Sequence, residues 1–255
     1  MNIITRNPFV VFVISLAILW ITARIGFYFR KISPNLLTEG REEISVILGA
    51  TLTLLGLIIG FSFSMAVNRY DQRKNLEEAE ANAIGTEYVR ADLLPDSDAV
   101  RTRTLLRKYL DQRILFYIMR DAMQLQGIDA STAQLQSDLW TSVRAPAATQ
   151  PPAVTTFVLS GMNDVLNSQG YLQAAWLNRI PTAAWVLMAA ISICGNLVLG
   201  YYASHIGTRT VLFLVIPLIV SISFFLIADI DSPRGGIIRV RPQNLVNLSK
   251  SLHGR

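Results

Sequence analysis

The chain has 255 residues, of which 51% are hydrophobic and only 16% are charged. Soluble domains carry about a quarter charged residues, so an ordinary soluble domain is excluded as a description of the whole chain. The formal net charge is +5, but the basic residues stand beside apolar stretches and not in runs interleaved with aromatic residues, which disfavours a nucleic-acid partner. The single cysteine, Cys194, excludes an internal disulfide.

Four stretches are nearly free of charge and long enough to cross a bilayer, which takes about 20 mostly apolar residues in a helix. They lie at residues 8–29, 44–67, 183–202 and 211–230. The first lacks a convincing small-x-small cleavage site and stays apolar beyond Arg24, so a membrane span is favoured over a signal peptide. The short connection at 205–210 predicts that the last two spans form an antiparallel hairpin.

Basic residues set the predicted orientation. With four spans, both termini and the long middle segment share one side of the membrane, and that side has more lysine and arginine near the helix ends: Arg6, Arg69, Arg73, Lys74, Arg179, Arg234, Arg239 and Arg241. The other side has Arg30, Lys31, Arg41 and Arg209. The excess places the termini and the middle segment in the cytoplasm.

The middle segment is expected to be helical throughout. The second span continues past residue 67 without proline, through residues that favour helix, until Pro95 ends it. A following helix, with apolar residues at three- and four-residue spacing, is expected to stop at Gly127, and Ser131 is expected to cap a shorter one. A loop at 145–152 and a last helix at 153–178 complete this segment, which we expect to pack against copies of itself or against extensions of the membrane helices.

The predicted fold is therefore an all-α membrane protein with four transmembrane helices and a helical cytoplasmic insert between the second and third. Residues 1–67 hold the first two spans, and residues 68–181 form the insert, whose first helix is continuous with the second span. Residues 182–230 form the hairpin of the last two spans, and residues 231–255 form a cytoplasmic tail.

Motifs for catalysis are not found. The two histidines, His205 and His253, stand on the short connection and near the C-terminus, and there is no glycine-rich phosphate loop or G-x-S-x-G elbow. We therefore expect no enzyme activity, no cofactor and no metal. Asp229 and Asp231 at the end of the fourth span suggest a cation site, but a solvated helix end is the favoured interpretation.

The second span carries the most informative pattern. Thr53, Leu57 and Phe61 follow one another at four-residue steps and share one helix face. Rings of such residues in an oligomer form a hydrophobic constriction that can gate by dewetting. Ser64 and Asn68 continue this face as pore-lining residues. The alternative is that the stripe packs against other helices or lipid.

Two basic residues at the exit of this span complete the hypothesis. Arg69 and Arg73 follow the pore-lining residues on the cytoplasmic side, where they could attract anions.

Two segments resemble a known family. Gly60-Phe61 followed by Arg69-Tyr70 is similar to the second helix of bestrophins, and EANAIGTEYVRADLLP at 80–95 resembles the signature of the bestrophin-like domain of bacterial membrane proteins. The resemblance covers nearly the whole chain. It implies a homo-oligomer, with a pentamer favoured, that forms a channel for small anions such as chloride in the bacterial inner membrane. It also implies that the neck falls on Phe61, Leu57 and Thr53.

A second hypothesis of another class remains open. The chain could be a non-conducting membrane scaffold or sensor whose cytoplasmic helical domain recruits a partner, because the insert is long and no selectivity-filter motif is present.

Overall fold

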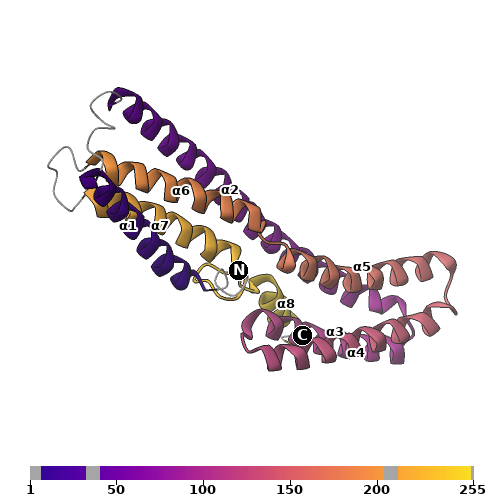
Figure 1. Ribbon diagram of the computed structural model, residues 1–255. Helices are drawn as coiled ribbons and strands as arrows, with labels where there is room; N and C mark the ends of the chain where they lie inside the picture. Colours follow the sequence, from indigo (N-terminus) through magenta and orange to yellow (C-terminus); the bar gives the residue numbers. More distant parts are fainter. Residues whose placement is uncertain (1–6, 33–40, 204–211, 254–255) are drawn as a thin grey trace. The chain divides into compact units, whose positions relative to one another are not determined.

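The computed structural model describes residues 7–32, 41–203 and 212–253, and these residues form helices and no strand (Figure 1). The predicted connection at 205–210, together with Arg6 and Arg209, lies outside the described residues. Four helical stretches are long and apolar enough to cross a membrane. The all-α prediction with four such helices is confirmed.

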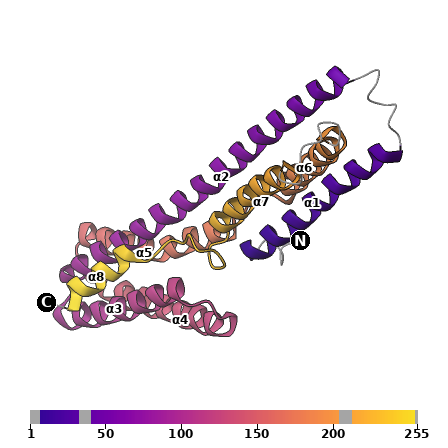
Figure 2. The same cartoon turned by 90° about the vertical axis from the view of Figure 1, so that its left-hand side faces the viewer.

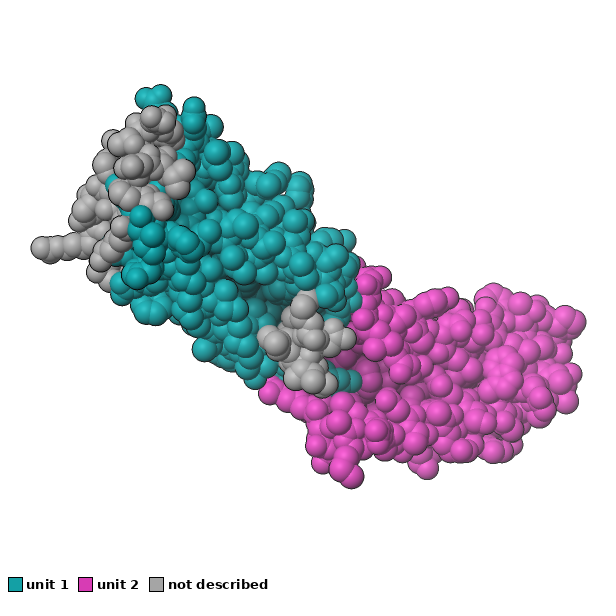
Figure 3. Space-filling view, viewed as in Figure 1, with its two compact units in different colours: residues 1–70, 179–239 teal, residues 71–178, 240–255 magenta. Residues whose placement is uncertain are grey.

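The chain divides into two compact units (Figure 3). Unit 1 comprises residues 1–70 and 179–239, and unit 2 comprises residues 71–178 and 240–255. The units therefore divide the chain close to the ends of the predicted insert, but unit 2 also takes in the last residues of the predicted tail.

Unit 1 contains α1 (Pro8–Ile32), the first part of α2 (Arg41–Arg90), α6 (Thr182–Ala203) and α7 (Leu212–Asp231). Helix α1 packs against both α6 and α7. Two glycines allow α1 and α6 to approach closely, because a Cβ at Gly26 would lie 2.1 Å from the Leu197 carbonyl oxygen and one at Gly200 would lie 2.0 Å from that of Ala23. Small residues at such crossings let helix backbones meet in a membrane.

Helix α2 is one unbroken helix of 50 residues (Figure 2). At about 1.5 Å per residue it is about 75 Å long, more than twice the ~30 Å hydrocarbon core of a bilayer. It contains the predicted second span and runs on into unit 2. A short 3-10 turn, η2 (Ala91–Leu93), follows, and the extended backbone at Leu94 and Pro95 ends the helical path.

Unit 2 has its own hydrophobic core. It is built from the second part of α2, α3 (Asp96–Ile118), α4 (Ala122–Ala147), α5 (Pro152–Leu177) and α8 (Gln243–His253). Fully buried side chains from all of these helices meet in one cluster that includes Ile84, Leu106, Leu139, Met162 and Leu245. The extended part of α2 thus packs against the helices that follow it in the chain.

Two predicted helix ends are wrong. The chain turns at 119–121, where the Asp121 side chain accepts the backbone N–H groups of Met123 (3.1 Å) and Gln124 (2.9 Å) and caps α4. Gly127, predicted to stop a helix, and Ser131, predicted to start one, both lie inside α4. An N-cap aspartate satisfies two otherwise unpaired donors, and this local gain outweighs the apolar periodicity that suggested one continuous helix.

The end of the predicted tail is a helix. Glu77 on α2 accepts the backbone N–H groups of Asn244 (2.9 Å) and Leu245 (3.1 Å) and the Asn244 side-chain amide (2.7 Å), all at the start of α8. A buried carboxylate from another helix therefore caps α8, and Leu245 fills the core beneath it.

Candidate functional site

The side chains predicted to line a pore lie along one exposed face of α2. In a single chain, Leu57 is 54% and Phe61 63% exposed. Thr53, Ser64 and Asn68 are exposed as well. The Thr53 hydroxyl donates to the Gly49 carbonyl oxygen at 2.9 Å, so its hydrogen is already used within the helix.

The opposite face of this part of α2 is covered. Leu55 and Ser62 are each 2% exposed and Ala66 is fully buried. Leu55 and Ala66 belong to the same buried cluster as Phe224 and Ile227 of α7. One face of α2 thus completes unit 1, and the other face is exposed in the single chain.

Glycines flank the exposed face. A Cβ at Gly49, Gly56 or Gly60 would meet no described atom within 4 Å. These positions therefore leave room for close approach by something outside the chain, whether lipid or another copy.

Arg69 lies away from this face. Twelve residues at about 100° each turn it about 120° from Leu57, and its Nη1 atom lies 3.6 Å from Asp231 Oδ1 of α7. The same Asp231 carboxylate accepts the Ile180 N–H at 3.2 and 3.3 Å. Arg69 therefore joins α2 to the end of α7, and its charge is countered within unit 1.

Arg73 also lies off the exposed face. It is sixteen residues from Leu57 and so turned about 160° from it, and only 1% of it is exposed. The structure does not bring Arg69 and Arg73 onto the face that carries the predicted neck.

Asp229 and Asp231 are not a solvated helix end, and that expectation is wrong. They are 1% and 4% exposed. The Asp229 carboxylate accepts the N–H groups of Ile237 (2.7 Å) and Ile238 (2.8 Å), which folds the following loop back onto the end of α7. Gly236 is required in this loop, because a Cβ there would lie 2.3 Å from the Asp229 carbonyl oxygen. Both carboxylates thus bind backbone donors.

In unit 2, α2 carries a different set of exposed residues. Asp71, Asn75, Glu78, Asn82 and Thr86 are all exposed. They continue at helical spacing from Asn68, and most carry amide or hydroxyl groups.

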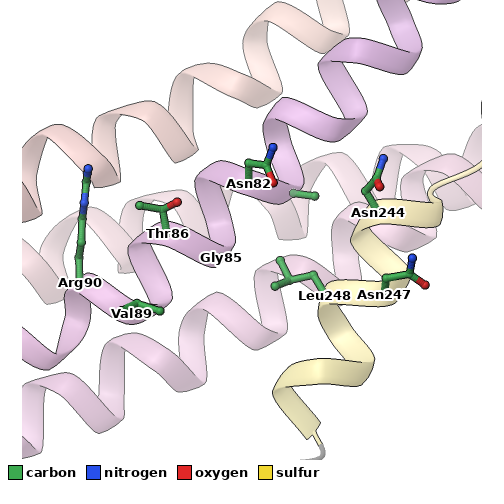
Figure 4. A pocket seen from close by; sticks show the side chains of 9 residues that line it. Asn82, Gly85, Thr86, Val89, Arg90, Asn244, Asn247 and Leu248 are labelled. Atoms are coloured by element: carbon green, nitrogen blue, oxygen red, sulfur yellow. The ribbon is translucent and has the colours of Figure 1, made fainter.

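A hollow of about 540 Å³ lies between α2 and α8, and Asn82 and Thr86 are among the residues that line it. Figure 4 shows Asn82, Thr86 and Arg90 on the α2 side and Asn244 and Asn247 on the α8 side. Leu248 of α8 approaches Gly85 closely, with 3.1 Å between its Cδ1 and the position of a Cβ. The hollow therefore has an apolar floor and a rim of amide groups.

A buried ion pair on the inner side of α2 was missed by sequence reasoning. Arg113 of α3 donates through Nε to Glu80 Oε1 at 2.5 Å, and both side chains are fully buried. The Arg113 guanidinium also lies 4.6 Å from the centre of the Phe116 ring. Burial raises the pKa of the Tyr109 and Tyr117 hydroxyls of α3 well above their usual range, so both stay protonated beside Glu80.

Comparison with known proteins shows which family the chain belongs to. The model of the bestrophin-like domain matches residues 16–245, which is most of the chain. The chain belongs to the bestrophin-like family. No curated protein sequence matches it.

Solved structures show the same fold. A bacterial bestrophin homolog from Klebsiella pneumoniae is similar over 95% of this chain and 97% of its own, with a TM-score of 0.65 and 11% sequence identity. A single-residue variant of the same homolog has a TM-score of 0.66 at 11% identity, covering 95% of this chain and 96% of its own. The chain is therefore a membrane protein. Its family and its fold support, at the level of the family, an ion channel.

The bestrophin-like signature at 80–95 has a structural explanation. Glu80 pairs with Arg113, and Gly85 admits Leu248. Glu87 is fully buried against α5, where a Cβ at Gly161 would lie 2.1 Å from its Oε2 atom. Glu80, Gly85 and Glu87 of the signature therefore pack within unit 2, whereas Asn82 and Thr86 of the same segment are exposed.

Proposed function

We propose that this bestrophin-like protein is a homo-oligomeric ion channel in which the exposed face of α2 lines the path. The supporting observation is that α2 packs with one face and leaves the other, which mixes apolar and polar residues, uncovered. Most of the exposed large residues of α1, such as Val13, Ile18 and Ile21, are by contrast apolar, as a lipid-facing helix requires, and Arg24 is the exception. Ser64 and Asn68 would be costly against lipid.

Thr53, Leu57 and Phe61 form the proposed neck. Because the Thr53 hydroxyl hydrogen is bonded to Gly49, Thr53 presents little donor capacity to a passing ion and acts with its apolar neighbours. Rings of such side chains restrict water and so raise the barrier to ions. Ser64 and Asn68 would line the path below the neck.

Assembly and location follow the resemblance and the charge pattern. A pentamer in the bacterial inner membrane, with both termini and the insert in the cytoplasm, satisfies both. Chloride or another small anion is the permeant ion that the resemblance implies. Arg69 and Arg73, the residues that would have attracted anions, lie off the exposed face and so give this choice no support.

Flux through liposomes tests the proposal. We expect the double variant Leu57→Ala and Phe61→Ala to carry ions several-fold faster than the wild type, because smaller side chains widen and wet the neck. The control is Val13→Ala on α1, a residue 62% exposed, which should leave flux unchanged. Absence of flux of both a cation and an anion from the wild type and the double variant would refute the channel.

A non-conducting scaffold or sensor is the second candidate. The amide-rimmed hollow between α2 and α8 favours it, because amide groups suit hydrogen bonds to a bound peptide. An experimental structure of the oligomer distinguishes the two. A central axis surrounded by the exposed α2 faces supports the channel, and α2 faces turned to lipid or to neighbouring helices support the scaffold.

A further inference from the structure

A second hollow lies in unit 1, between the end of α1, the start of α2 and the end of α6. Its volume is about 240 Å³, and the surface that lines it is entirely apolar. Phe29 of α1, Ile47 of α2 and Leu197 of α6 are among its lining residues, and all three side chains are exposed in the single chain. We call this hollow the apolar groove.

The packing of the three helices explains the apolar groove. The backbones of α1 and α6 meet at its floor, where a Cβ at Gly26 would lie 2.1 Å from the Leu197 carbonyl oxygen. Helix α2 contacts α6 further from the helix ends, where a Cβ at Gly195 would lie 3.5 Å from Thr51 Cγ2 and 3.8 Å from Leu52 Cδ2. The first turns of α2 therefore form a wall beside the floor that α1 and α6 provide.

The apolar groove lies at the level of one membrane surface. Helices α1 and α6 end, and α2 begins, within about two turns of its lining residues. Tyr28 stands in the last two turns of α1, and Tyr201 and Tyr202 stand in the last turn of α6. Tyrosine is enriched where spans pass from hydrocarbon to headgroups. A molecule in the groove would therefore extend from the headgroup level into the hydrocarbon.

A positive charge stands beside the apolar groove. Arg30 follows Gly26 by one helical turn and is half-buried. Its Nη1 atom donates to the carbonyl oxygen of Tyr201, a lining residue, at 3.5 Å. A guanidinium is planar and can bind two oxygens of a phosphate at once. The site thus combines an apolar surface with an anion-binding group at headgroup level.

This combination selects the occupant. A water molecule needs two to four polar partners, which an apolar surface does not supply, and an empty groove would forfeit dispersion contacts. Basic pockets between transmembrane helices bind phospholipid headgroups. We infer that the apolar groove binds one acyl chain of a phospholipid, with the phosphate of that lipid held by Arg30. The predicted orientation places this lipid in the periplasmic leaflet, and the site does not depend on whether the protein conducts ions.

Native mass spectrometry of the full-length protein tests the inference. The protein is stripped of lipid in detergent and then given dioleoylphosphatidylglycerol, and we expect one tightly bound lipid per chain. Dioleoylglycerol, which has the same acyl chains but no phosphate, should bind several-fold more weakly. Arg30→Gln should weaken phosphatidylglycerol binding several-fold. Arg24→Gln is the matched control, because it removes an exposed charge from the same helix about 160° from Gly26, and it should bind lipid like the wild type.

A second pair of variants tests the acyl chain separately from the phosphate. Ile47→Trp fills the apolar groove without adding charge and should abolish the tight binding, whereas Val46→Trp changes an exposed neighbour outside the lining and should not. Equal lipid binding by the wild type, Arg30→Gln and Ile47→Trp overturns the inference. So does a wild type that binds no lipid while Ile47→Trp lowers the number of chains in the complex, because the groove then holds a second copy.

Discussion

Single side chains inside unit 2 decide how firmly the extended part of α2 is held. Glu80 and Arg113 are fully buried beside the large apolar and aromatic cluster of unit 2. Such a pair contributes little over a well-packed apolar replacement, but removing one partner leaves the other charge without compensation.

Replacing Arg113 by methionine should therefore lower the free energy of unfolding by about 3–5 kcal/mol. Chemical denaturation in detergent, followed by circular dichroism, measures this loss. Arg101→Met on the same helix removes an exposed charge and is the control. The role assigned to the pair is wrong if the two variants unfold at the same denaturant concentration, and the double variant Glu80→Gln with Arg113→Met should recover part of the loss.

Asp231 shows how one side chain can change the interpretation of another. By binding both the Ile180 N–H and Arg69, it draws the arginine at the end of the second span towards α7. Sequence position alone suggests an anion site at such an arginine. The direction of its side chain around the helix decides whether it can contact an ion on the proposed path.

Among the helices of unit 1, α1 and α6 cross closely. Glycines at both sides of the crossing bring backbone against backbone, at Gly26 and at Gly200. Without a hydrophobic force between helices in lipid, such close packing supplies much of their attraction.

The variant Gly200→Ala should force α1 and α6 apart, because its methyl group would lie 2.0 Å from a backbone oxygen that cannot move alone. Overpacking of this kind costs about 1–3 kcal/mol. A lower thermal midpoint in detergent is the expected result. Gly195→Ala in the same helix meets only side chains, the nearest at 3.5 Å, and should unfold like the wild type. Equal midpoints for the two variants would contradict the close crossing.

Helix α2 joins two kinds of environment in one element. Its exposed face is apolar around Leu57 and Phe61 and becomes polar and acidic from Asn68 onwards, whereas its inner face supplies core residues to both units. The same helix therefore carries both the residues of the proposed neck and the polar residues that follow them.

For the assembled molecule, the essential question is whether the α2 faces of different copies meet. Asn68 is exposed on the proposed path, below the neck. If α2 surrounds an axis, Asn68→Cys in a Cys194→Ser background should form disulfide-linked dimers under copper phenanthroline, seen on non-reducing gels. Val13→Cys on α1 should form far fewer. Equal yields at both positions would argue against an axis lined by α2.

Sequence reasoning reached the fold because the relevant signals are local. The length of an apolar stretch identifies a membrane span. An uninterrupted series of helix-favouring residues predicts that α2 continues beyond the span. The common face of Thr53, Leu57 and Phe61 likewise follows from helical periodicity alone, and all three are exposed in the structure. The chain's own residues and its resemblance to bestrophins thus led to the family that the comparison established.

Only the tertiary structure decided the partners of the charged residues. Asp231 and Arg69 are 162 positions apart in the chain, and Glu77 and Asn244 are 167 apart, so no periodicity connects them. The Asp121 cap of α4 is by contrast a local feature, because its bonds reach only Met123 and Gln124. Local sequence determines which helices form and which face of each is apolar, because both depend on neighbours within a few turns. Which charges are neutralised, and hence which remain on the exposed face of α2, depends on residues that only folding brings together.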